Sequence, residues 1–109
     1  MSFRHAAVIA LFVPTWAWAN FLNGNTLKTL CNMQDETVCR AYVLGVIDSA
    51  MTLQAGGFST VSICTPGEVS GEQATAIVEK YLTEHPEELH TAASSLVLQA
   101  IGIAFPCTE

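Results

Sequence analysis

The four cysteines of this chain, Cys31, Cys39, Cys64 and Cys107, constrain its fold more than any other feature. An even number of cysteines in a short exported chain is typical of disulfide bonds. Four cysteines can pair in three ways, and their spacing alone does not select one pairing. Zinc binding is the competing use, but the sequence has no CxxC motif and no paired-histidine spacing. We therefore expect two disulfides and no metal or other cofactor.

The first 19 residues have the order of elements found in a secretory signal peptide. A weakly basic start at Arg4 and His5 precedes the apolar run 6–13 and then Ala17-Trp18-Ala19, whose alanines suit the positions that a signal peptidase reads. The apolar run is much shorter than the roughly 20 residues that a membrane-spanning helix needs. We therefore predict a signal peptide over residues 1–19, cleaved after Ala19, with an uncleaved anchor as the alternative.

Residues 20–109 are then expected to form one acidic domain. The whole chain has a formal net charge of −6 with neutral histidines, and loss of Arg4 with the signal peptide makes the remainder more acidic. Such a surface repels the phosphates of nucleic acids and of anionic lipids, which argues against both as partners after cleavage. A basic protein partner is compatible with this charge.

The spacing of apolar residues predicts an all-α fold, a small bundle of about four helices, with almost no strand signals. The first helix is expected at about 26–33, with Asn25 as its N-cap. The second is expected at about 36–55, ending at Gly56-Gly57. Because the second helix is apolar over most of its circumference, it is predicted to lie centrally or at a subunit interface. Its main apolar side is predicted to hold Val38, Cys39, Tyr42, Val43, Val46 and Leu53.

The third helix, expected at about 71–84, has the most regular pattern. Ser70 and Gln73 have the spacing of a capping box. Glu72 and Glu79 fall on the face opposite the core, which is therefore predicted to be solvated and acidic. The predicted core stripe follows helical periodicity and consists of Ala74, Ile77, Val78, Tyr81 and Leu82.

The fourth helix is expected to begin at Pro86, because proline suits the first helical position, and to end at Phe105-Pro106. Leu98 points away from the predicted core and is a candidate dimer contact, although an isolated surface leucine usually has no such role. The predicted buried face consists of Leu89, Ala93, Leu96, Val97, Ala100, Ile103 and Ala104.

The sequence lacks the converging groups that an enzyme needs. His85 and His90 lie around a predicted helix start, so they face different ways and do not form the i, i+4 pair of a metalloprotease. We expect His85 to cap a helix or lie at the surface, and His90 to be packed or hydrogen-bonded. Asp48 is interpreted as a polar-strip residue or a buried anchor. We assign no catalytic residue and predict that the chain is not an enzyme.

Several motifs, in order along the chain, resemble the Rap/Tai family of periplasmic immunity proteins of bacterial type VI secretion systems. The resemblance covers about Leu22 to Cys107, and its most specific parts are the His-Pro-Glu-x-Leu-His segment and the Phe-Pro-Cys ending. One departure is Ala41, where the family often has glycine. The matching motifs are Cys39-x-x-Tyr42-x-x-Gly45-Val46-x-Asp48, Cys64-x-Pro66-Gly67-x-Val69, Tyr81-Leu82-x-x-His85-Pro86-Glu87-x-Leu89-His90 and Ala104-Phe105-Pro106-Cys107.

The resemblance implies a compact helical protein, commonly a homodimer, that binds a peptidoglycan-cleaving amidase effector in the periplasm and blocks its active site. It also implies that Cys31 pairs with Cys39 and Cys64 with Cys107. Effector contacts are expected on the acidic helical face and in the loop 56–62. The expected contact residues are Glu72, Glu79, Gly57, Phe58 and Ser59.

A small periplasmic chaperone of the acid-stress type is the main alternative, because it shares an exported, helical and disulfide-bonded plan. Its carboxylates and histidines would gain protons at low pH, which would loosen a dimer. Another helical protein-binding module remains a further alternative. Suppression of the aggregation of unrelated proteins at low pH would favour the chaperone.

Overall fold

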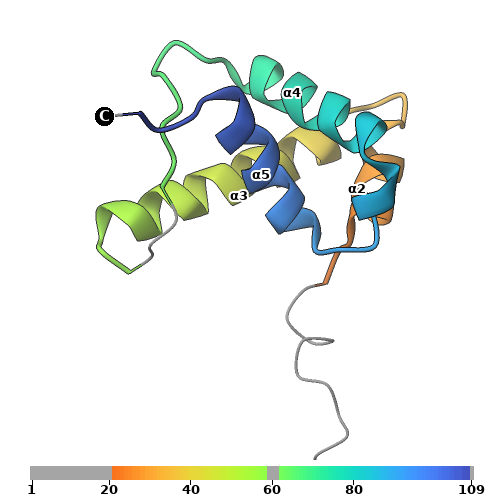
Figure 1. The fold of residues 1–109 in the computed structure, drawn as a ribbon. Coiled ribbons are helices and arrows are strands. Elements are labelled where there is room, and N and C mark those ends of the chain that lie inside the picture. The colour runs from red at the N-terminus through yellow and green to blue at the C-terminus, as the bar shows by residue number, and fades with distance from the viewer. Residues whose placement is uncertain (1–20, 59–61, 109) are drawn as a thin grey trace, which may run out of the picture.

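The computed structural model describes residues 21–58 and 62–108, and it confirms the predicted all-α fold (Figure 1). The helices are α2 (Gly24–Cys31), α3 (Thr37–Ala55), α4 (Gly71–Glu84) and α5 (Ala93–Ala104), with a short 3-10 turn, η2, at Pro86–Glu88. The described residues contain no strand, only an isolated bridge between Asn23 and Ala92. The predicted signal peptide lies outside the described residues.

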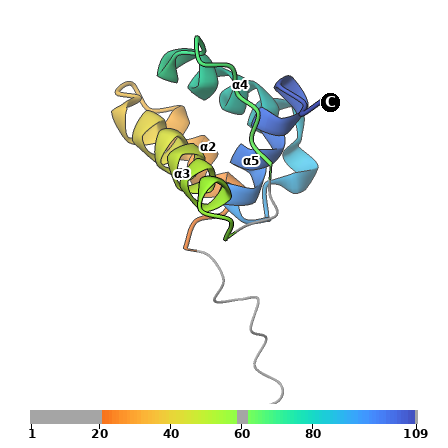
Figure 2. The same cartoon turned by 90° about the vertical axis from the view of Figure 1, so that its left-hand side faces the viewer.

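The three longer helices contact one another, and α2 packs against all three. Helix α3 runs along one side of the molecule, in the opposite direction to α4, and α5 packs against both (Figures 1 and 2). The core that they enclose is continuous. Its fully buried members are Leu27, Leu82, Leu96, Ile101, Val43, Val78, Val97 and Cys39.

Helix α2 begins two residues earlier than predicted, and its N-cap is Asn23 rather than Asn25. The Asn23 side chain accepts a hydrogen bond from the Thr26 backbone N–H at 2.9 Å. The first backbone N–H groups of the helix donate to a distant segment: Gly24 to the Thr91 carbonyl oxygen and Asn25 to that of Leu89, both at 2.9 Å. These tertiary bonds satisfy donors that a helix start otherwise leaves free, and the local sequence does not reveal them.

Helix α3 buries a narrower stripe than predicted. Cys39, Val43, Ile47 and Ala50 are buried. The prediction was wrong for Val38, which is 53% exposed, and for Leu53, which is 46% exposed. Leu53 is exposed because the C-terminal part of α3 extends beyond the helices that pack against it (Figure 1), where residues 51–58 are all exposed.

Helix α4 has the predicted bounds and the predicted start. The Ser70 hydroxyl accepts a hydrogen bond from the Gln73 backbone N–H at 3.0 Å, which is the main bond of the capping box. Four residues of the predicted core stripe are buried and Ile77 is half-buried. Thr75 is also buried, and its hydroxyl donates to the Gly71 carbonyl oxygen at 2.8 Å.

The fourth predicted helix is divided in the structure. Pro86 begins the short turn η2, and α5 starts only at Ala93, so the predicted helix start at Pro86 was wrong. The residues between the two elements pair with the segment before α2, and the Ala93 backbone N–H donates to the Leu22 carbonyl oxygen at 2.9 Å. Leu89 is buried outside the helix, whereas Ile103 and Ala104 are exposed instead of buried.

Two disulfides brace the helices, with the pairing that the family resemblance implied. Cys31–Cys39 joins the end of α2 to the first turn of α3, with Cα atoms 4.8 Å apart. Cys64–Cys107 joins the segment before α4 to the chain after α5, with Cα atoms 5.2 Å apart. Among the described residues, no helix is both long and apolar enough to cross a membrane.

Candidate protein-binding surface

The turn that ends α3 places Phe58 in solvent. Gly57 has a φ of +76°, and its backbone N–H donates to the Gln54 carbonyl oxygen while that of Phe58 donates to the Leu53 carbonyl oxygen at 2.8 Å. This pair of bonds is a Schellman motif, which favours glycine at the left-handed position. A Cβ on Gly56 would lie only 2.8 Å from the Phe58 ring. The Phe58 backbone is therefore fixed, while its side chain is 81% exposed.

The far end of the loop that begins at Phe58 is also fixed. The Gln54 side chain forms two hydrogen bonds with the Ile63 backbone, accepting from its N–H and donating to its carbonyl oxygen, the latter at 3.3 Å. Ile63 is buried, and the next residue, Cys64, is bonded to Cys107. Ser59, one of the predicted contact residues, lies outside the described residues, as do residues 60 and 61.

Glu72 is exposed on α4, as predicted. One carboxylate oxygen lies 4.0 Å from Nη2 of Arg40 on α3, and the Glu72 side chain is 80% exposed. An ion pair this open contributes little to stability. The Glu72 carboxylate therefore remains available to a partner.

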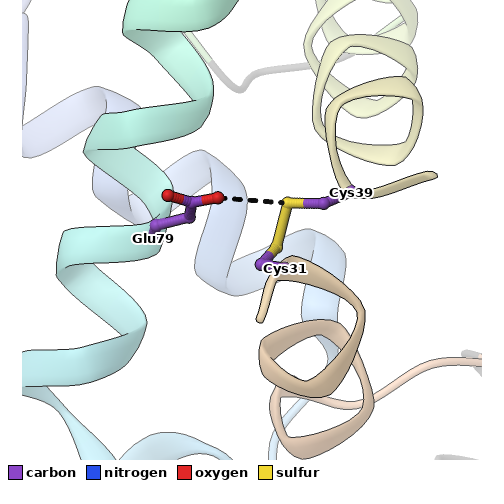
Figure 3. A group of neighbouring side chains, drawn as sticks. All are labelled: Cys31, Cys39 and Glu79. Carbon is purple, nitrogen blue, oxygen red and sulfur yellow. Dashed lines mark hydrogen bonds between the residues drawn. A yellow bond between two sulfur atoms is a disulfide. The ribbon is translucent and has the colours of Figure 1, made fainter. Parts of the chain in front are cut away.

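Glu79 does not lie in open solvent, which corrects the prediction of a fully solvated acidic face. Its side chain turns from α4 toward the Cys31–Cys39 disulfide, and Oε2 lies 3.8 Å from Cys39 Sγ (Figure 3). Burial raises the pKa of the Glu79 carboxyl, the charge of Glu36 raises it further, and Arg40 opposes both effects. Glu79 is therefore a less accessible contact residue than Glu72.

The structure does not bring the predicted contact residues together. Glu72 and Glu79 lie beside the N-terminal part of α3, near Arg40 and Cys39. Gly57 and Phe58 lie beyond the opposite end of this helix. At 1.5 Å per residue, the two groups are separated along α3 by about 25 Å. A single small partner loop would not reach both groups.

An open apolar groove of about 500 Å³ lies between α3 and α5, and the sequence did not predict it. Leu98, the candidate dimer contact, lies in this groove and is half-buried. A Cβ on Gly45 would meet no atom within 4 Å, so the floor of the groove is open at that point. The small residues Ala41, Gly45 and Ser49, spaced four apart on α3, were the feature of the sequence that could have indicated this groove. The groove is lined by Ala41, Tyr42, Gly45, Val46, Ser49, Ala50, Leu53, Ser94 and Leu98.

A polar network around Tyr81 joins α4, η2 and α5. The Tyr81 hydroxyl donates to Glu88 Oε1 at 2.7 Å and lies 2.8 Å from the side-chain amide oxygen of Gln99. Burial and then the contact with Glu88 raise the pKa of Tyr81 to about 12. The His85 ring stacks on that of Tyr81, with centroids 4.1 Å apart, and its Nδ1 lies 3.1 Å from Glu87 Oε2. His85 thus lies at the surface, as predicted, in a network that connects structural elements.

The remaining polar groups give no catalytic arrangement among the described residues. His90 is exposed, which corrects the expectation that it is packed. Asp48 is exposed on the polar strip of α3, one of its two predicted positions. His85, Glu87 and Glu88 could each direct one atom toward a shared ion. Nδ1 of His85, however, already lies 3.1 Å from Glu87 Oε2 and 3.7 Å from Glu88 Oε2.

A small helical domain with an exposed aromatic turn and an open apolar groove has the features of a protein-binding module. A comparison with family models matches residues 23–107 to the Rap1a immunity proteins. The chain belongs to this family, which implies an immunity function against a secreted effector protein and an inhibitor rather than an enzyme. Among curated proteins and solved structures, none matches the chain.

Proposed function

We propose that this protein is a periplasmic immunity protein that binds a peptidoglycan amidase effector of a type VI secretion system and blocks its active site. The protein would protect the producing cell and its siblings from this effector. Family membership supports binding of a secreted effector. The pattern of residues 1–19 supports export to the periplasm.

The observation that carries this proposal is the exposed Phe58 on a fixed turn. An aromatic side chain that is 81% exposed in the free protein gains a large buried area when it enters a cleft. Its backbone is held by the Schellman bonds, so little conformational freedom is lost on binding. Inhibition then requires shape and an apolar anchor but no reactive group.

We propose further that two copies associate through the α3–α5 groove. The groove is apolar, and its lining includes Leu98 and the exposed Leu53. The open floor at Gly45 allows a partner helix to approach closely. Leu98→Glu places a charge in the groove and should convert a dimer to monomers with the helical content unchanged. A dimer that survives this substitution, measured by light scattering after gel filtration, would exclude the groove as the contact.

The proposed function predicts that a gene beside that of this protein encodes a secreted Cys–His peptidoglycan hydrolase, and a hydrolase found there is the effector to test. Expression of this hydrolase in the periplasm should be toxic, and co-expression of the present protein should restore growth. Phe58→Ala should weaken binding about 10- to 100-fold, because burial of a phenylalanine side chain contributes about 1.5–3 kcal/mol. Its melting temperature should not change.

Ile103→Ala is the matched control, because Ile103 is also an exposed apolar residue but lies on α5, outside the loop. Its binding constant should equal that of the wild type. An equal loss in both variants would show that Phe58 is not the anchor. Failure to bind any cell-wall amidase, together with protection of unrelated proteins at low pH, would favour the chaperone instead.

A further inference from the structure

The Cys31–Cys39 disulfide has a carboxylate beside one of its sulfur atoms (Figure 3). Glu79 approaches from α4, 40 residues further along the chain, and its Oε2 lies 3.8 Å from Cys39 Sγ. A disulfide sulfur carries no hydrogen, so it does not donate a hydrogen bond to this oxygen. The contact becomes important when the disulfide breaks, because the departing sulfur then carries a negative charge.

The helix ends favour Cys39 as the departing sulfur. Cys39 is the third residue of α3, near the positive end of the helix, where a thiolate is stabilised. Cys31 is the last residue of α2, near the negative end of that helix. Without Glu79, the α2–α3 disulfide would therefore have a good leaving group at Cys39.

Solvent access favours the same direction of reaction. Cys39 is 0% exposed as a residue and Cys31 is 5% exposed, so Cys31 is the half of the disulfide that lies nearer to solvent. The attacking sulfur forms a new bond to Cys31 Sγ, the Cys31–Cys39 bond breaks, and its electron pair leaves on Cys39 Sγ as a thiolate. With a dithiol as reductant, its second thiolate then displaces Cys31, and the dithiol is oxidised to a disulfide.

We propose that Glu79 protects the Cys31–Cys39 disulfide from thiol–disulfide exchange by opposing the thiolate that forms on Cys39. A like charge at this distance raises the pKa of a thiol, and a leaving thiol with a higher pKa departs more slowly. The Glu79 carboxylate thus offsets the effect of the α3 N-terminus. Attack on Cys39 itself is also opposed, because it would bring an anionic thiolate toward the same carboxylate. The protected bond keeps α2 attached to α3.

The test compares the wild type with Glu79→Gln and Glu72→Gln. Glutamine has the shape of glutamate without its charge, and Glu72 is a carboxylate of the same helix whose side chain is 80% exposed. The oxidised proteins are treated with dithiothreitol, and alkylation followed by peptide mapping gives the reduction rate of each disulfide. Cys31–Cys39 should be reduced about threefold faster in Glu79→Gln, since a like charge changes a thiol pKa by about one unit and exchange rates change by about half a logarithmic unit per pKa unit. Glu72→Gln should react like the wild type.

Two further measurements distinguish protection from a general loss of structure. Direct exchange has a rate that rises in proportion to dithiothreitol, whereas reduction through unfolding reaches a plateau. With Cys31→Ser, which leaves Cys39 as a free thiol beside the intact Cys64–Cys107 disulfide, thiolate absorbance at 240 nm should give a Cys39 pKa about one unit lower when Glu79→Gln is added. A reduction rate within twofold of the wild type, or a faster rate that reaches a plateau, would overturn the proposal.

Discussion

Gly45 and Gly24 both lie within helices, and the structure predicts opposite effects when each is replaced by alanine. Gly45 lies in the middle of α3, and a Cβ at this position would meet no atom within 4 Å. Alanine is favoured over glycine in a helix interior by about 0.8–1.0 kcal/mol. Gly45→Ala should therefore stabilise the fold by about 1 kcal/mol, which raises the melting temperature by about 4–8 °C in a domain of this size.

Gly24, the first residue of α2, is the matched comparison. A Cβ there would lie 2.5 Å from Leu96 Cδ1 and 2.9 Å from both the Cα and the carbonyl oxygen of Leu89. The leucine side chain can rotate, but the Leu89 backbone is held by its bond from the Asn25 N–H. Forcing a methyl group into such a space costs about 1–3 kcal/mol. Gly24→Ala should lower the melting temperature.

Thermal unfolding followed by circular dichroism measures both variants, with light scattering on the same samples to give the oligomeric state. A lower melting temperature for Gly45→Ala, with the oligomeric state unchanged, would refute the conclusion that the space above Gly45 is open in the folded chain. If that loss accompanied conversion of a dimer to monomers, the added methyl group would be meeting a second copy across the groove.

Three other predictions follow from the fold. Cys64 and Cys107 are both exposed and 43 residues apart, so their joint replacement by alanine removes little packing. It should lower the free energy of unfolding by about 4 kcal/mol, because the unfolded chain gains the entropy that the disulfide removes. A loss below 1 kcal/mol in urea unfolding would contradict this model. Gly57→Ala places a Cβ at a φ of +76° and should lower the free energy of unfolding by about 1–2 kcal/mol. Gly67→Ala is the control: its Cβ would meet no atom within 4 Å, so the melting temperature should not change. The folded pKa of Tyr81 is about 12, above the ordinary tyrosine value of 10.0. Its contribution to stability is therefore complete below pH 10 and is lost as the pH rises through 12. Tyr81→Phe should flatten the decline in stability over this range, and an equal decline in both proteins would count against the raised pKa.

Local signals in the sequence were sufficient for some elements of the fold. The start of α4 was predicted because Ser70 caps a backbone N–H three residues away, which is a contact within one turn. Its core stripe follows helical periodicity and was also correct. The glycines at the end of α3 were correctly identified as a stop, because a left-handed residue is needed there.

Other features depend on contacts that the sequence does not display. Asn25 was chosen as a cap because nothing local shows that its backbone N–H donates to Leu89. Pro86 can begin a long helix or a short turn, and the pairing of residues 91–93 with the segment before α2 selects the turn. Periodicity placed Glu79 on a polar face but did not show that a disulfide lies against that face. The groove was missed because Tyr42 and Val46 were assigned to the buried side of α3.

The restraints around the Phe58 loop connect the fold to the proposed function. The Schellman bonds fix the start of the loop, and the Gln54–Ile63 bonds with the Cys64–Cys107 disulfide fix its end. Ordering one residue of a free chain costs about 1–2 kcal/mol, so a loop whose ends are already fixed binds with a smaller entropic loss. The exposed disulfide contributes to both properties, since it stabilises the domain by linking distant segments and fixes Cys64 just after the loop.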